Sequence, residues 1–261
     1  AGDIGWAAVP LSRLHDDPAR VALARAGVDV RLRWRATAIE AAGGAVRGVA
    51  GPDGLLQADA VVLAVPHDRA ARLLPEGAVR AAGELRSLGT SPIVNLHVAY
   101  DRAVLDVPFA AGVDTPVQYL FDRTASSGLA GGQLIAVSLS AAAAEMALSP
   151  DELRARYLPA LAELLPAARD ARVRSFHVTR EAAATFHAGP GSARLRPGAR
   201  TGVAGLALAG AWTDTGWPAT MEGAVRSGHA AAAHALAALG ARRGAPAGRA
   251  PVRDETLSVV E

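Results

Sequence analysis

The chain has 261 residues and is 51% apolar, so it can bury a substantial core, and wholesale disorder is not expected. Its net charge is +2 and no basic stripe runs along it, so we expect no nucleic-acid partner. Cysteine is absent, which excludes disulfides, cysteine-ligated zinc, iron–sulfur clusters and thiol catalysis. No apolar run is long enough to span a membrane, and we expect a cytoplasmic protein.

The first part of the chain combines a helix with strands. Residues 10–27 predict a helix, and residues 28–40 predict a strand in which apolar and arginine side chains alternate. A hairpin with glycine-rich turns at 43–44 and 52–54 is expected next. The short, mainly apolar run 58–66 ends at a proline and predicts a strand that is buried on both faces.

The middle of the chain is rich in predicted strands. Residues 67–90 are expected to be helical and connecting. Strands are then predicted at 91–100, 116–123, 131–140 and 171–186. Between the last two, Ser149, Pro150 and Glu152 form a capping box that predicts the start of a helix. The apolar face of this helix over 150–165 has two interpretations, contact with the core or contact with lipid.

The last part of the chain returns to a buried strand and a helix. The run 205–210 predicts a strand, and a helix is expected from about Met221 to Leu239. The first amides of that helix have no intrahelical acceptor and carry the positive end of its dipole, so an electron-rich carbonyl or an anion fits there. The alternative is an ordinary strand–loop–helix connection in which Trp212 and Trp217 are core plugs.

The string "LAGAWTDTGWPATMEGAVRSG" in this last region resembles the C-terminal flavin-binding motif of the FAD-dependent amine oxidase and phytoene desaturase superfamily. Within that superfamily it is most similar to the squalene-associated branch, the hydroxysqualene dehydroxylases. The stretch 9–40 resembles the family's helix and adenine-side strand, and the stretch 58–66 resembles the strand that returns to the cofactor. The resemblance covers about residues 8–240.

The resemblance and the order of elements predict an α/β (α+β) architecture. It is an incomplete FAD/NAD(P)-binding-type domain interrupted by an inserted antiparallel-sheet substrate domain. The expected division is 1–66 and 191–240 for the FAD-binding domain, 67–190 for the substrate domain and 241–261 for a disordered tail. The family's N-terminal G-x-G-x-x-G helix is not found here, so we expect the chain to correspond to the C-terminal part of a longer protein.

The resemblance implies FAD as the cofactor. The positions that match the family's cofactor contacts are Gly210, Ala211, Trp212, Trp217, Thr220, Met221, Ala36 and Pro66. Ala211 departs from the family, which has an acidic residue there. No metal is expected, because His229 and His234 are five residues apart and do not have the i, i+4 spacing of a helical metal pair.

The implied reaction is the reductive dehydroxylation of hydroxysqualene to squalene, in bacterial hopanoid synthesis, with a lipophilic isoprenoid substrate and peripheral membrane contact. The leaving hydroxyl needs a proton donor, and the candidates are Asp214, His97 and Tyr119. Each has a structural alternative: a turn cap for Asp214, a satisfied strand histidine for His97 and a core position for Tyr119. Other functions left open are a carotenoid desaturase, an amine oxidase, and a truncated remnant that cannot bind FAD.

Overall fold

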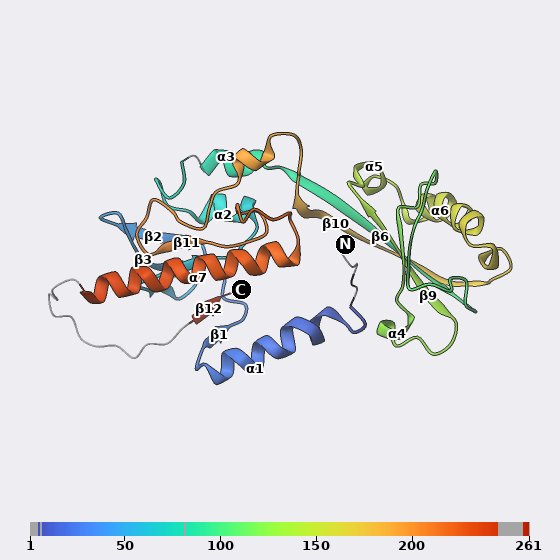
Figure 1. Ribbon diagram of the computed structural model, residues 1–261, viewed down its shortest axis with the longest axis horizontal. Helices are drawn as coiled ribbons and strands as arrows, with labels where there is room; N and C mark the ends of the chain where they lie inside the picture. The colour runs from blue at the N-terminus through green and yellow to red at the C-terminus, as the bar shows by residue number, and fades with distance from the viewer. Residues whose placement is uncertain (1–4, 6, 81, 245–257, 261) are drawn as a thin grey trace. The chain divides into compact units, whose positions relative to one another are not determined.

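The computed structural model describes residues 5, 7–80, 82–244 and 258–260 of the chain (Figure 1). The residues fall into two units. The first, called here the sheet unit, comprises residues 1–22 and 90–184. The second, called the strand–helix unit, comprises residues 23–89 and 185–261. Each unit has a hydrophobic core of its own.

The sheet unit is built on a five-stranded sheet with the strand order β10–β6–β9–β8–β7. The strands are β6 (Thr90–Tyr100), β7 (Phe109–Ala111), β8 (Tyr119–Asp122), β9 (Gln133–Ser140) and β10 (Val173–Phe186). Side chains alternate between the two faces of β6, as predicted, so that Val94, Leu96 and Val98 are fully buried. His97 lies on the opposite, half-exposed face of this strand.

Helix α6 (Pro150–Leu164) packs on the buried face of this sheet. The predicted capping box is confirmed, because the Ser149 side chain accepts from the amide of Glu152 and the Glu152 side chain accepts from the amide of Ser149. Leu153, Tyr157 and Leu161 are buried in the core of the unit. The lipid-contact interpretation of this face is therefore wrong, because the sheet already covers it. The short helices α4 (Thr124–Ser127), α5 (Ala143–Met146) and η2 (Pro166–Ala168) complete this part of the fold.

The strand–helix unit contains a parallel pair and two further small sheets. Strand β5 (Val61–Leu63) pairs in parallel with β11 (Leu206–Leu208), and α7 (Met221–Gly244) packs against β11 (Figure 1). The meander β2–β3–β4 comprises Ala38–Ala42, Ala45–Gly51 and Gly54–Gln57, and β1 (Asp29–Arg31) pairs with β12 (Ser258–Val260). The remaining elements are α2 (His67–Leu73), α3 (Ala82–Ser87) and η3 (Ser192–Leu195).

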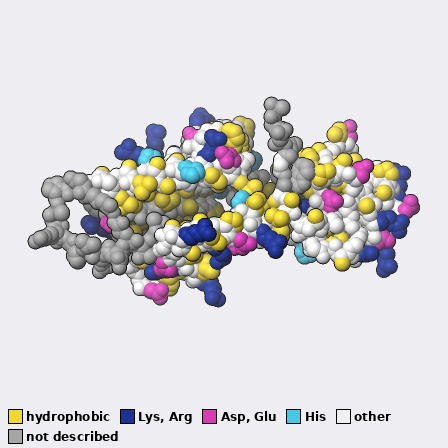
Figure 2. Space-filling model, turned by 60° about the horizontal axis from the view of Figure 1, so that its bottom comes forward, with side chains coloured by type: hydrophobic (Ala, Val, Ile, Leu, Met, Phe, Trp, Pro, Cys, Tyr) yellow, Lys and Arg dark blue, Asp and Glu magenta, His cyan; other side chains and the backbone are white. Residues whose placement is uncertain are grey.

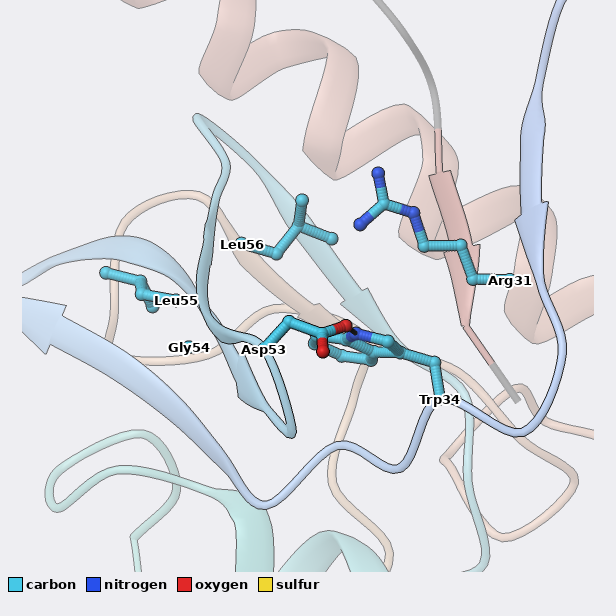
Figure 3. Close-up of a pocket in the computed structure, with 6 residues that line it drawn as sticks. All are labelled: Arg31, Trp34, Asp53, Gly54, Leu55 and Leu56. Atoms are coloured by element: carbon cyan, nitrogen blue, oxygen red, sulfur yellow. Dashed lines mark hydrogen bonds between the residues drawn. The ribbon is translucent and has the colours of Figure 1, made fainter.

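The predicted strand over 28–40 is wrong, because the chain turns at Leu32–Arg33 and resumes as a strand only at Ala38. Arg33 adopts a positive φ of 58° at this turn. The turn brings Trp34 inward, where its indole Nε1 donates to Asp53 Oδ2 at 3.1 Å (Figure 3). Gly51 makes room for the ring, since a Cβ there would lie 2.2 Å from it. A pocket of about 90 Å³ lies beside this pair.

Several predicted boundaries also differ from the structure. The structure groups residues 67–89 with the strand–helix unit and residues 1–22 with the sheet unit. Helices η1 (Ser12–Asp16) and α1 (Asp17–Arg25) bury no residue. The tail predicted to be disordered over 241–261 includes the end of α7 and strand β12, whereas 245–257 and 261 lie outside the described residues. The strand at 58–66 is not buried on both faces, because Val62 is 41% exposed.

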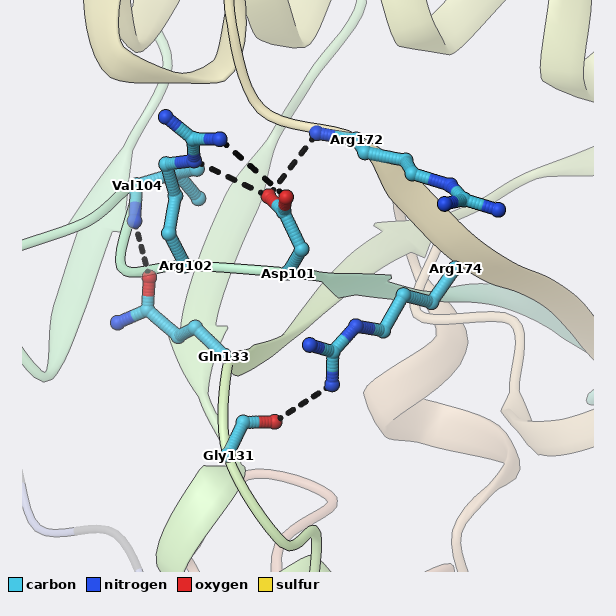
Figure 4. A network of polar contacts seen from close by, with 7 residues as sticks. All are labelled: Asp101, Arg102, Val104, Gly131, Gln133, Arg172 and Arg174. Carbon is cyan, nitrogen blue, oxygen red and sulfur yellow. Dashed lines mark hydrogen bonds and ion pairs between the residues drawn. The ribbon is translucent and has the colours of Figure 1, made fainter.

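A network of polar contacts closes one end of the sheet unit (Figure 4). The buried side chain of Gln133 accepts through Oε1 from the amides of Val104 and Leu105, at 2.7 and 2.9 Å. Its Nε2 donates to the Leu105 carbonyl at 2.7 Å and to Asp122 Oδ2 at 2.9 Å. Beside it, the Arg102 guanidinium hydrogen bonds to Asp101 and lowers the pKa of that carboxyl. One glutamine therefore satisfies three backbone groups that no strand partner reaches.

We predict that Gln133→Ala lowers the free energy of unfolding by about 2–3 kcal/mol, because it leaves buried backbone groups without partners. The control is Gln118→Ala. Gln118 also bonds to backbone, at Ser140, but it is exposed, and its loss should cost no more than about 1 kcal/mol. Urea unfolding of both variants measures the difference, and equal losses would contradict the assignment.

Candidate functional site

The candidate site lies where the parallel strands β5 and β11 end. Carboxyl ends of adjacent parallel strands meet at one edge of a sheet, which is where open α/β sheets bind ligands. The indole Nε1 of Trp212 donates to the carbonyl of Val65 at 2.8 Å and so ties the two strand ends together. Gly210 allows this fold-back, because it has a φ of 137° and a Cβ on it would lie 2.4 Å from the Trp212 Nε1.

The start of α7 is capped and is fastened to β11. Thr220 Oγ1 accepts from the amide of Gly223 at 3.1 Å. Ser227 Oγ accepts from the amide of Gly210 at 2.7 Å and donates to the Ala224 carbonyl at 2.6 Å. Of the first amides of the helix, that of Gly223 is therefore taken by the side-chain cap and is not available to a ligand. Sequence reasoning missed Ser227, although a serine among alanines and glycines on a buried helix stripe is a signal.

Backbone donors without acceptors cluster in this region. Within the described part of the chain, no acceptor is found for the amides of Ala211, Trp212, Thr215, Trp217, Met221 and Glu222. The hydroxyl Oγ1 of Thr215 is also buried without a partner. Buried polar groups in proteins are nearly always hydrogen-bonded, so the Thr215 hydroxyl and the amide of the buried Trp212 are the members that call for a partner. Trp217, Met221 and Glu222 are exposed, and amides at a helix start can meet an electron-rich ligand such as the carbonyl edge of a flavin.

The two tryptophans of the motif lie in different environments. Trp212 is buried, so the core-plug alternative holds for it. Trp217 is 42% exposed, and the Arg226 guanidinium lies 4.4 Å from the centroid of its ring. Met221 is 62% exposed at the helix start. Only Trp217 of the pair therefore presents a ring to solvent or ligand.

The other predicted cofactor residues also belong to the strand–helix unit. Ala211 follows Gly210 and is half-buried. Pro66 precedes α2 directly and accepts through its carbonyl from Arg69 and Ala70. The Trp212–Val65 hydrogen bond brings it to the candidate site. Ala36 lies in the connection between β1 and β2 and makes no hydrogen bond to the candidate loop among the described residues.

The predicted proton donors divide between the units. Asp214 is exposed in the loop, its Oδ1 accepts from the amide of Gly216 at 3.2 Å, and its own amide donates to the Pro197 carbonyl. This is the turn-cap role named as its alternative. His97 and Tyr119 belong to the sheet unit. Tyr119 is 43% exposed, so its core alternative is wrong, and its ring stacks on Phe109 with centroids 5.9 Å apart.

His97 lies beside strand β10. Its Nε2 is 3.4 Å from Thr179 Oγ1, and its ring centroid is 6.2 Å from that of His177. Burial lowers the pKa of His97, and the positive charges of His177 and Arg123 lower it further. A neutral imidazole accepts a proton more readily than it donates one, so His97 suits the donor role less well than the sequence indicates.

Charged side chains are interspersed among hydrophobic ones on the face shown in Figure 2. Among the residues described, no group of three His, Cys, Asp or Glu side chains is arranged to hold a metal ion. In the same part of the chain, no helix is both long enough and apolar enough to cross a bilayer.

The chain matches the family described as flavin containing amine oxidoreductase over residues 2–236. It is 35% identical over 238 residues to hydroxysqualene dehydroxylase of Rhodopseudomonas palustris, covering 87% of this chain and 51% of that protein. It is 25% identical over 184 residues to 15-cis-phytoene desaturase of Synechococcus elongatus, covering 67% of this chain and 39% of that protein.

The fold is likewise shared with solved structures. Cyclohexylamine oxidase from Brevibacterium oxydans superposes with a TM-score of 0.58 at 21% identity, covering 78% of this chain and 48% of that chain. This likeness confirms the predicted α/β fold of the FAD-binding type. The chain spans about half the length of the hydroxysqualene dehydroxylase and 39% of the length of the phytoene desaturase that it matches.

We predict that His97 makes stability depend on pH. The pKa of folded His97 lies below the value of 6.5 for a free imidazole, so the unfolded chain binds the proton more readily. Its contribution to stability is therefore full above that value and is lost as the pH falls below 6.5. Thermal unfolding across this range should show a smaller decline for His97→Gln than for wild type, whereas the exposed control His229→Gln should follow wild type.

We predict different costs for the two tryptophans. Trp212→Phe removes the donor to Val65 and leaves a small cavity, so the free energy of unfolding should fall by about 2 kcal/mol. Trp217→Phe should stay within about 0.5 kcal/mol of wild type, because its ring is half-exposed. Urea denaturation measures both, and a larger loss at Trp217 would contradict the environments described.

Proposed function

Because this chain belongs to the family of flavin containing amine oxidoreductases, we propose that it forms the C-terminal part of an FAD-dependent oxidoreductase that acts on an isoprenoid lipid. The specific reaction proposed is the reductive dehydroxylation of hydroxysqualene to squalene, as in hopanoid synthesis. The observation that carries the proposal is the cluster of unpaired amides between β11 and α7, together with the 35% identity to a hydroxysqualene dehydroxylase.

FAD is the cofactor of this family, and the residues of the candidate site fit it. The amides of Met221 and Glu222 lie at the positive end of α7, where negative charge is stabilised by about 0.3–1 kcal/mol on an exposed helix. Thr215 Oγ1 adds a buried hydroxyl with no partner in the described residues. The bound cofactor supplies two electrons as a hydride.

The proposed reaction breaks one C–O bond and forms one C–H bond. A hydride adds to the substrate carbon, the hydroxyl takes a proton, and water leaves, so atoms and electrons balance. The protein must bind a hydrocarbon and supply the proton. Phe109, Tyr119 and Phe121 form a contiguous aromatic patch on the half-exposed face of the sheet, and such a patch suits an isoprenoid chain.

Two of the predicted candidates, Tyr119 and Asp214, are proposed as the proton donor. Tyr119 carries a phenol on this aromatic patch, and Asp214 carries an exposed carboxyl in the cofactor loop. His97 suits the role of proton acceptor. Peripheral membrane contact remains part of the proposal, but the apolar face of α6 does not make that contact, because it packs in the core.

A second candidate function is that of a carotenoid desaturase, favoured by the match to 15-cis-phytoene desaturase. The family description also includes amine oxidation. A third is a non-catalytic chain that does not bind FAD. Ala211 favours this reading, because the family's acidic residue is replaced there.

We predict that the purified protein binds FAD and is yellow, with absorbance in the region of about 370–450 nm from the cofactor's own chromophore. Reduced and supplied with hydroxysqualene, it should form squalene, detected by mass spectrometry. Parallel reactions with phytoene and with simple amines test for carotenoid desaturation and for amine oxidation. Protein that stays colourless after incubation with FAD would instead support the non-catalytic chain.

A further inference from the structure

Arg196 contacts more of the candidate loop than any site residue expected from the sequence. It directly follows η3, and its Nε donates to the Trp212 carbonyl at 3.3 Å. Its Nη2 lies 3.2 Å from the Ala211 carbonyl, 2.5 Å from that of Thr213 and 2.9 Å from that of Trp217. One guanidinium therefore contacts four carbonyl oxygens of a single short loop.

The positive charge of Arg196 interacts mainly with these carbonyls. Its side chain is half-buried, and its Cζ lies 5.4 Å from the centroid of the Phe186 ring. Among the residues the structure describes, no carboxylate forms an ion pair with it. A half-buried cation without a carboxylate needs other negative partners, and the negative ends of the loop's peptide dipoles provide them.

These contacts fix the direction of the loop's peptide groups. In a trans peptide the N–H points away from the C=O, so the carbonyls of Ala211, Trp212 and Thr213, which face Arg196, turn the amide that follows each of them away from it. The fourth carbonyl, that of Trp217, precedes Pro218 and has no following N–H. The amides of Thr213 and Asp214 then donate to the carbonyls of Gly210 and Pro197. The amide of Trp212 is left without an acceptor among the described residues, as are others of the same region.

We infer that Arg196 is a positioning residue for the cofactor loop. By drawing the carbonyls of residues 211, 212, 213 and 217 to itself, it keeps their negative ends away from the ligand. The loop is then ordered before the ligand arrives, with the Trp212 N–H turned away from Arg196 and left to meet an electron-rich atom. The inference deepens the proposed function, since the ligand meant is FAD. A lysine would not fully replace Arg196, because its single nitrogen cannot reach both the Trp212 carbonyl, which Nε contacts, and the three carbonyls that Nη2 contacts.

The first test needs no cofactor. Amide hydrogen exchange is measured in FAD-free wild type and in Arg196→Ala, Arg196→Lys and Arg194→Ala. Arg194 is the matched control, because it lies in η3 two residues before Arg196, is exposed and makes none of these loop contacts. The amides of Thr213 and Asp214 should exchange at least about tenfold faster in both Arg196 variants and at the wild-type rate in the control. Unchanged exchange in Arg196→Ala overturns the inference.

Chemical rescue separates a specific contact from general loosening. Free guanidinium, added to Arg196→Ala well below the concentration that unfolds the protein, should restore slow exchange in the loop. The same concentration of sodium chloride should not. Exchange that remains fast with guanidinium, or that slows equally with sodium, counts against the proposed contact.

The second test titrates the same proteins with FAD and follows flavin absorbance and fluorescence. Both Arg196 variants should bind FAD about tenfold more weakly than wild type, and the Arg194 variant should match it. A loosened loop with wild-type FAD affinity overturns the inference. If wild type itself binds no FAD, the proposed function fails, and the exchange and rescue results alone decide whether Arg196 orders the loop.

Discussion

The parallel pairing of β5 with β11 is the constraint on which the candidate site depends. It brings the residues after Leu63 and after Leu208 to one edge, and the hydrogen bond from the Trp212 indole to the Val65 carbonyl holds them there. Arg196 then binds the loop that leaves this edge, while Ser227 ties the following helix back to Gly210. Side chains from three separate segments thus shape one connection between a strand and a helix.

Hydrogen-bond satisfaction distinguishes this loop from the other polar clusters of the chain. Gln133 and Asp101 in the sheet unit use their polar atoms on backbone and side-chain partners, which is the behaviour of structural groups. At the candidate site, by contrast, the described residues leave backbone amides and the Thr215 hydroxyl without partners. Unmet donors beside carbonyls that Arg196 contacts are the observation on which the proposed ligand site rests.

Local patterns predicted the elements, but contacts distant in sequence decided the site. The capping box at Ser149 and the buried strand before Gly210 depend on neighbouring residues, so the sequence could predict them. The break in the predicted strand over 28–40 depends on the contact of Trp34 with Asp53, 19 residues away. Likewise, nothing near Arg196 in the sequence indicates that it binds carbonyls 15 to 21 residues further on.

The charges around the loop explain why an electron-rich ligand suits it even without an acidic residue at 211. The Asp214 carboxylate accepts from the amide of Gly216, and Glu222 is paired with Arg226 at 2.7 Å, so both acids of the motif are engaged locally. Arg196 and the amino end of α7 each contribute positive potential. An acidic side chain at 211 would offset part of that potential. The replacement that favours the non-catalytic chain therefore also leaves the positive potential of the loop undiminished.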